Sequence, residues 1–255
     1  MQKNSADVIT FGDESTYCLH FNASKPPFDD IRLRLALSLV IDVVDYVGRL
    51  DEASRRPAFG GFVPPGVPCH IADSGMRKNI DLARQLLSEA GFPEGKGFPS
   101  LEIVVSDGRI NEGALLREYW NETLNIDIKL VSLPFPEFLE RTHDGSFVLS
   151  FAGWSADYPD PDSFLFGSPW LEQSGWENKE YLDLVQKARF TIDQTERKKH
   201  YRKAQELITK EVPLMPLFYN LIRYFVKANV QNFWIAPRTT LPVFQDLILG
   251  PDKDG

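Results

Sequence analysis

Hydrophobic and polar positions along the middle of the chain predict three short strands joined by two helices. In chain order these elements are a strand at 101–105, a helix at 112–124, a strand at 126–131, a helix at 136–143 and a strand at 147–152. Strands that are joined by helices need crossover connections, which place the strands parallel in an α/β layer. The pattern therefore predicts a βαβαβ unit, with a ligand edge at the carboxyl ends of its strands.

The flanking segments predict further elements around this unit. They are a strand at 17–22 ended by Pro26 and Pro27, a helix from Asp29 to about Arg49, a surface loop at 56–75, a helix at 81–90 with Leu82, Leu86 and Leu87 inward and Gly91 as its stop, a helix at 178–188, a helix capped by Asp193 with Glu196, and a strand at 217–226. Apolar spacing and capping residues support each helix. The chain is thus expected to form an α/β fold.

The segment 154–165, WSADYPDPDSFL, follows the last strand of the βαβαβ unit and joins an aromatic ring to three aspartates and two prolines. Asp157, Asp160 and Asp162 allow three interpretations. They are paired carboxylates or oxygen ligands for a cation, solvated turn residues, or an ammonium-binding loop in which Trp154 packs on the ligand. The spacing of these aspartates does not match a calcium-binding loop. The distance between two catalytic carboxylates cannot be read from a loop sequence, so nothing favours the first interpretation.

Composition narrows the class of protein. The chain has 255 residues, of which 43% are hydrophobic and 25% charged, as is ordinary for a soluble globular protein. A net charge of -8 argues against nucleic acid or an anionic membrane surface as a partner. No apolar run is long enough to span a bilayer, so we expect a protein that is not integral to a membrane.

Signatures for cofactors and metals do not appear in the sequence. The four histidines share no ligand spacing, and the glycines form no phosphate-binding motif. Cys18 and Cys69 lie in unlike contexts and are expected to be unpaired buried thiols. We therefore expect no cofactor, no metal and no catalytic residue.

Five segments in order resemble the extracellular solute-binding proteins of peptide, nickel and opine importers of the ABC type. The segments are YCLHFNASKPPFDDIRLRLALSLVID, DLARQLLSEAGFPEGKGFP, FAGWSADYPDPDSFL, the helix pair after Asn178, and EVPLMPLFY. Each motif is weak by itself, but five in the same order make the resemblance specific, and they cover about residues 17–219.

The resemblance implies a type II periplasmic-binding-protein fold, in which two lobes close on a ligand. It also implies that this chain is the C-terminal half, a lobe with a mixed, partly parallel sheet flanked by helices. Three parts are expected: residues 1–25 as a strand segment that enters from the other lobe, residues 26–213 as the main α/β lobe, and residues 214–255 as a return segment and C-terminal tail.

The resemblance also implies site residues. In the peptide-binding members the aspartate of the W-x-x-D loop contacts the ligand's α-ammonium group and the tryptophan lies against the peptide, and these positions are Asp157 and Trp154. Phe135 matches a position that is often a tryptophan lining the cleft, and Phe233 matches an aromatic near the crossing that returns to the other lobe. Phe151 departs from members that carry an arginine there, which puts capture of a short peptide's carboxylate by that position in doubt.

The function implied is the substrate-binding component of an ABC importer, for peptides or another small molecule, acting with permease subunits as a monomer and not as an enzyme. The implied location is the periplasm, or the cell exterior with a lipid anchor. Two alternatives remain open at this point. One is the ligand-sensing module of a transcriptional regulator, and the other is a hydrolase that uses Asp157 and Asp160. In the favoured interpretation, Trp154 and Asp157 face an open surface.

Overall fold

The strands form one mixed sheet and a small separate ribbon. The structure is a computed structural model that describes residues 7–235 and 242–251. Its strands are β1 (Asp7–Phe21), β2 (Arg55–Pro57), β3 (Leu101–Ser106), β4 (Ile128–Leu133), β5 (Leu149–Ser155), β6 (Leu214–Val226), β7 (Val230–Gln231) and β8 (Ile248–Leu249). Strands β1 to β6 form the sheet in the order β2-β6-β1-β5-β3-β4, and β7 pairs with β8.

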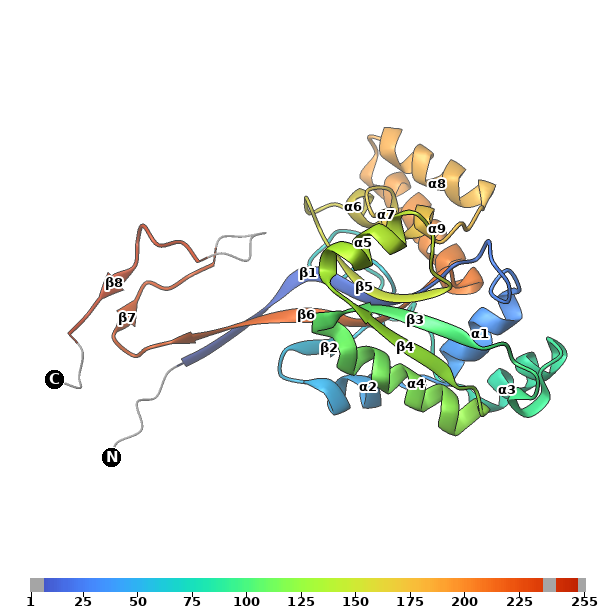
Figure 1. The fold of residues 1–255 in the computed structure, drawn as a ribbon. Helices are drawn as coiled ribbons and strands as arrows, with labels where there is room; N and C mark the ends of the chain where they lie inside the picture. Colours follow the sequence, from blue (N-terminus) through green and yellow to red (C-terminus); the bar gives the residue numbers. More distant parts are fainter. Residues whose placement is uncertain (1–6, 236–241, 252–255) are drawn as a thin grey trace, which may run out of the picture.

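The predicted parallel unit is confirmed. β3 is parallel to both β4 and β5, whereas β1 is antiparallel to β5 and β6, and β2 is antiparallel to β6. The crossovers are α4 (Ile110–Leu124) and α5 (Phe135–His143), and they lie on opposite faces of the sheet (Figure 1). The fold is therefore α/β with a mixed, partly parallel sheet flanked by helices, as expected.

Helices cover both faces of the sheet. They are α1 (Ile31–Leu39), α2 (Val43–Leu50), α3 (Ile80–Glu89), α6 (Asp162–Leu165), α7 (Pro169–Gln173), α8 (Lys179–Phe190) and α9 (Gln194–Glu211), with short 3₁₀ turns η1 (Pro93–Gly95) and η2 (Asp107–Arg109). Buried side chains of α1 to α4 pack with Phe151 and Phe218 on one face. Those of α5 to α9 pack on the other, around Phe164, Tyr201 and Trp170, because strand side chains alternate between faces.

The helix predicted from Asp29 to Arg49 is two helices. Asp30 caps α1 by accepting a hydrogen bond from the Arg32 N–H, and Asp42 caps α2 by accepting from Val44 and Asp45. An aspartate at this place favours a new helix start, because its carboxylate satisfies backbone N–H groups that an uninterrupted helix would bond internally. The apolar pattern was continuous, so the break was not predicted.

The prediction of a surface loop at 56–75 is wrong for its central part. Phe62 and Val63 are buried in the core next to α6 and α8. The backbone there is tied down by Thr16, which donates to the Phe62 carbonyl, and by the Tyr219 hydroxyl, which accepts from Gly60 N–H and donates to the Gly61 carbonyl. Side chains from β1 and β6 supply these bonds, and local sequence could not show them.

The inward face of α3 also differs from the prediction. Ala83 and Leu87 are buried and Leu86 is partly buried against the core, but Leu82 is 39% exposed. Ala83 and Leu87, four residues apart, define the inward face of α3, and Leu82 lies beside that face. The stop at Gly91 is confirmed, because this residue has φ +97°, a conformation that glycine adopts without steric cost.

The outer halves of β1 and β6 leave the body as a paired arm (Figure 1). On the arm, the rings of Phe11 and Tyr224 stack with centroids 5.9 Å apart. The inner halves of the same two strands run through the middle of the sheet. Residues near both ends of the chain therefore contribute to the body and also project from it. Both cysteines are free thiols, and Cys18 is buried as expected, whereas Cys69 is only half-buried.

Candidate ligand-binding site

The carboxyl ends of β3, β4 and β5 meet at one edge of the sheet. Ser106 at the end of β3 is in register with Leu133 at the end of β4, and both strands run parallel with β5. The segments that leave this edge contain Arg109, Phe135 and Asp157. Because ligands of open α/β sheets bind outside the carboxyl ends of the strands, this edge is the candidate site.

Trp154 is more firmly placed than a loop residue would be. It lies within β5, opposite Thr16 of β1. Its indole Nε1 donates to the Ser163 carbonyl at 2.8 Å, and its half-buried ring packs against the core. Ser163 also accepts, at its Oγ, a 3.0 Å hydrogen bond from the Asp157 N–H. The buried Ser163 therefore holds the indole of Trp154 and the backbone of Asp157 in place.

Asp157 presents its carboxylate to solvent. The residue is exposed, in agreement with the expected open surface. Among the residues that the structure describes, none forms a hydrogen bond or ion pair with this carboxylate. The backbone of Asp157 is held while its charge is free, an arrangement suited to binding a positive group from outside the chain.

The interpretation of Asp160 and Asp162 as solvated turn residues is wrong. Asp160 receives two hydrogen bonds from Arg197, at 2.8 and 2.7 Å. Asp162 lies 3.1 Å from Arg189 and accepts hydrogen bonds from the hydroxyls of Tyr158 and Tyr201. Both carboxylates attach the loop to α8 and α9.

The Asp160 carboxylate is held ionised by its internal partners. Burial raises the pKa of Asp160, but the hydrogen bonds from Arg197 and the Asp162 N–H outweigh it and hold that pKa below its ordinary value. Asp160 is thus kept ionised and committed to an internal partner. In the described part of the chain, no group of three or more histidine, cysteine or acidic side chains could hold a metal ion.

The two predicted aromatic site residues lie in different parts of the molecule. Phe135 is 57% exposed at the start of α5 and stacks on Phe138, at the same edge as Trp154. Phe233 follows β7 and packs on Tyr224, with ring centroids 5.4 Å apart, so it belongs to the arm. The structure brings Phe135, Trp154 and Asp157 to one edge and does not bring Phe233 there.

A charged cluster at this edge was missed by the sequence reasoning. Glu112 is only 2% exposed and accepts hydrogen bonds from Arg55 at 2.8 Å and Arg109 at 2.9 Å. Arg109 also donates to the Tyr17 hydroxyl at 2.7 Å. Two guanidinium groups share one carboxylate, so the cluster carries an excess positive charge. The residues are far apart in sequence, and only Arg109 and Glu112 showed a local signal, their spacing of three.

Phe151, the position that departs from some relatives, is part of the core. Its side chain is buried, and its ring stacks on Tyr17 with centroids 6.0 Å apart. Gly153 lies beside the same tyrosine, so closely that an added Cβ would come within 2.6 Å of the ring. The side chains beneath the edge next to Trp154, an aromatic floor, are therefore Tyr17 and Phe151, and the Arg109 guanidinium lies over the Tyr17 ring, 4.3 Å from its centroid.

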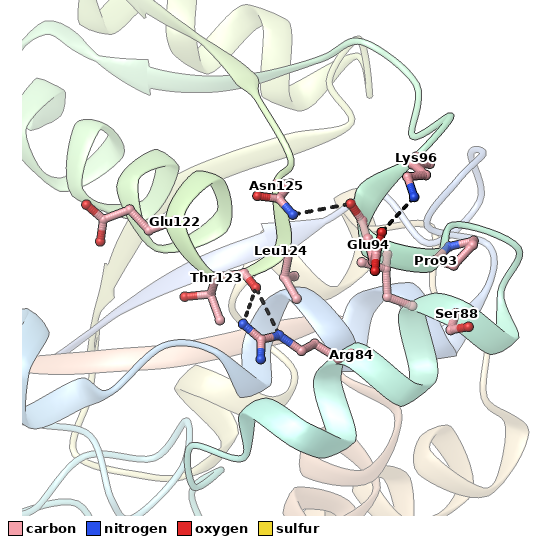
Figure 2. A pocket seen from close by; sticks show the side chains of 10 residues that line it. Arg84, Ser88, Pro93, Glu94, Lys96, Glu122, Thr123, Leu124 and Asn125 are labelled. Atoms are coloured by element: carbon pink, nitrogen blue, oxygen red, sulfur yellow. Dashed lines mark hydrogen bonds and ion pairs between the residues drawn. The ribbon is translucent and has the colours of Figure 1, made fainter.

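A polar pocket of about 670 Å³ lies elsewhere and is not the candidate site (Figure 2). It is lined by residues of α3 and the end of α4 and by residues that follow these helices, among them Arg84, Glu94 and Asn125. These segments precede the amino ends of β3 and β4. In Figure 2, Arg84 donates to the Thr123 carbonyl and Asn125 donates to the Glu94 carbonyl. The polar groups that line this pocket therefore mainly bond to one another.

The chain thus forms an α/β body with a mixed sheet and an exposed candidate ligand edge at the carboxyl ends of its parallel strands. The family model described as "Bacterial extracellular solute-binding proteins, family 5 Middle" matches residues 2–178. The chain belongs to this family.

Individual relatives agree with the family. The chain is 27% identical to the periplasmic oligopeptide-binding protein OppA of Escherichia coli over 235 residues, which are 88% of this chain and 42% of that protein. It is 29% identical to the probable deoxycholate-binding periplasmic protein YgiS of E. coli, over 84% of this chain and 42% of that protein. The chain therefore spans about two fifths of the length of these relatives.

A solved structure shows the same fold. The periplasmic oligopeptide-binding protein of Borrelia burgdorferi superposes with a TM-score of 0.81 at 23% identity, over 93% of this chain and 50% of that one. The family is extracellular by description, which confirms the location implied by the resemblance. Among the described residues no helix is long and apolar enough to cross a bilayer. The relatives are binding proteins, so the comparisons do not support the regulator or hydrolase alternatives.

Proposed function

We propose that this chain forms one lobe of the substrate-binding component of an ABC importer for peptides. The observation that carries the proposal is the free carboxylate of Asp157, held beside the fixed indole of Trp154 at the carboxyl edge of the sheet. The names of the relatives, which include oligopeptide- and dipeptide-binding proteins, support peptides as the ligand class.

The proposed contact is an ion pair between the ligand's α-ammonium group and Asp157. A charge-assisted hydrogen bond of this kind contributes roughly 1.5–3 kcal/mol, which is enough to orient a peptide. The indole of Trp154 and the exposed ring of Phe135 offer apolar area to side chains of the ligand. If the other contacts are made to the backbone of the peptide and not to particular side chains of it, the site would accept peptides of varied sequence.

The lobe is proposed to act with a second lobe that closes over this edge. Segments 1–25 and 214–255 would cross to that lobe, and the paired arm of β1 and β6 supports this because both strands extend beyond the body. Phe233 lies on the arm and would reach the ligand from the side of the second lobe. Closure would present the loaded protein, as a monomer, to permease subunits.

The proposal is tested with the full-length protein and the peptides that co-purify with it, identified by mass spectrometry and resynthesised. Titration calorimetry compares wild type, Asp157→Asn, and Asp183→Asn as a control, because Asp183 is an exposed acid on α8. We expect the dissociation constant to rise by about tenfold or more in Asp157→Asn only, in line with one lost charge-assisted bond. An N-acetylated peptide should bind wild type and Asp157→Asn equally.

Two results would contradict the proposal. Equal affinity of wild type and Asp157→Asn for a free-amine peptide would remove the ammonium anchor. A co-purifying ligand that is not a peptide and carries no ammonium group would remove the ligand class.

A further inference from the structure

The turn between α8 and α9 exposes two large apolar side chains. Phe190, the last residue of α8, is 82% exposed, and Ile192 is 92% exposed. Leu182, two turns earlier on the same helix, is exposed as well. Single exposed apolar residues are common on protein surfaces. Two neighbours that are almost fully exposed at one turn form an apolar tip, and such a patch indicates an interaction surface.

The local structure explains why these side chains find no internal partner. The inner face of α8 is already made by Tyr181, Leu184, Val185 and Ala188. Ile192 stands just before the cap of α9, where an apolar residue usually packs on the fourth residue of the helix. That position is Arg197, whose guanidinium is bound to Asp160. Ile192 is therefore left in solvent.

The hairpin that carries the tip differs in charge from the rest of the chain. Residues 179–211 contain nine basic and six acidic residues, a net charge of +3 in a chain of net charge -8. The negative charge that argued against an anionic surface is thus located elsewhere. The whole-chain value hides a basic segment on α8 and α9, two helices that lie on the outer margin of the body (Figure 1).

The acidic side chains near the tip have internal hydrogen-bond or ion-pair partners. Asp193 accepts hydrogen bonds from the N–H groups of Thr195 and Glu196, and Glu196 pairs with Lys199 at 2.6 Å. On either side of the tip, Lys187 and Lys198 form no ion pair within the described residues. Asp193 keeps its negative charge, which the N-terminus of α9 offsets in part, and among the described residues Lys187 and Lys198 are the unpaired cations nearest the tip along the two helices.

We propose that the α8–α9 turn binds an anionic phospholipid surface, with Phe190 and Ile192 inserted at the headgroup boundary and Lys187 and Lys198 on the headgroups. Apolar side chains flanked by lysines suit this interface, because the apolar groups leave water while the charges stay hydrated and meet anionic lipid. A fluid bilayer offers no groove of fixed shape, and the exposed side chains of this turn can insert without one. The inference does not depend on the ligand class proposed above.

Binding at this turn would place the candidate ligand edge near the membrane. Arg189 and Arg197, which flank the tip, hold Asp162 and Asp160. The loop that carries Asp157 is thus attached to the hairpin through two ion pairs. A hairpin on the membrane would keep that edge close to the bilayer.

The experiment is co-sedimentation of the unlipidated full-length protein with protein-free vesicles. One set contains phosphatidylglycerol and phosphatidylcholine, and the other contains phosphatidylcholine alone. Wild type is expected to sediment with the anionic vesicles, and added salt should weaken this binding. The double variant Phe190→Ser/Ile192→Ser should lower the partition coefficient by about tenfold or more. Lys187→Glu/Lys198→Glu should abolish the preference for anionic vesicles.

The matched control is Val44→Ser/Leu82→Ser, which removes two exposed apolar side chains on α2 and α3 and should leave vesicle binding unchanged. Thermal unfolding of all variants checks that each is folded. The proposal is overturned if wild type does not bind the anionic vesicles, or if Phe190→Ser/Ile192→Ser binds as well as wild type. Binding that appears only with native membranes, and not with protein-free vesicles, would identify a protein partner instead and equally overturn it.

Discussion

Arg197 binds Asp160 through two parallel hydrogen bonds, from Nη1 to Oδ2 at 2.8 Å and from Nη2 to Oδ1 at 2.7 Å. This contact joins the first turns of α9 to the loop that follows β5. It explains how a loop with three aspartates keeps one shape: Asp160 is neutralised from within, and Asp157 remains available.

Arg197→Ala is expected to lower the free energy of unfolding by about 2 kcal/mol, because it leaves a partly buried carboxylate without its charge-assisted partner. Urea denaturation measures the change. The control is Arg202→Ala, whose ion pair with Glu206 is 3.5 Å long and exposed, and its cost should stay within about 0.5 kcal/mol. Equal costs for both variants would contradict a structural role of the Arg197 contact.

Glu112→Gln is expected to be more costly, by about 3 kcal/mol, because it removes the buried charge that two guanidinium groups share. Arg55 and Arg109 would then repel each other at the edge. The same measurement on Glu118→Gln provides the comparison, since Glu118 pairs with Arg49 at the surface. If the two substitutions cost the same, the cluster does not stabilise the edge.

Gly153→Ala tests the packing of the aromatic floor. An added methyl group would come within 2.6 Å of the Tyr17 ring, and overpacking of this kind costs about 1–3 kcal/mol. Gly12→Ala on β1 is a suitable control, because nothing lies within 4 Å of its added Cβ. Thermal unfolding should separate the two variants, and a Gly153→Ala protein as stable as Gly12→Ala would show that the ring moves freely.

His20 predicts a pH dependence of stability. Its ring is buried beside Trp170, its Nδ1 has no hydrogen-bond partner among the described residues, and burial lowers the pKa of His20 from 6.5 to about 4. Between pH 4 and pH 6.5, His20 is therefore protonated in the unfolded chain and neutral in the folded chain. Stability from this group is complete above pH 6.5 and is lost as pH falls, by roughly 3 kcal/mol at pH 4.

Urea denaturation from pH 7 to pH 4 measures this loss. His20→Gln should remove that part of the slope, whatever the variant costs at neutral pH. His143→Gln changes an exposed histidine on α5 and should keep the slope of the wild type. A slope that is the same in wild type and His20→Gln would show that other groups cause the acid sensitivity.

Much of the fold follows from local pattern. The alternation of strands and helices over residues 101–152 predicted the parallel unit, because crossover connections admit few topologies. The cap at Asp193 and the stop at Gly91 are likewise local, since each satisfies backbone groups of its own helix. Trp154 and Asp157 were placed at the ligand edge by the same reasoning, as neighbours of a strand end.

Tertiary contacts decided the rest. The partners of Asp160, Asp162 and Glu112 come from helices and strands up to tens of residues away, and hydrogen bonds between distant side chains leave no periodic trace in the sequence. Phe233 matched an aromatic position but packs on Tyr224 of the arm, because β6 extends beyond the body before the chain reaches this residue. The sequence by itself determined which elements form and which strand ends meet. Only the folded chain decided which carboxylates are neutralised and which one stays free, because pairing depends on distances in space and not on spacing along the chain.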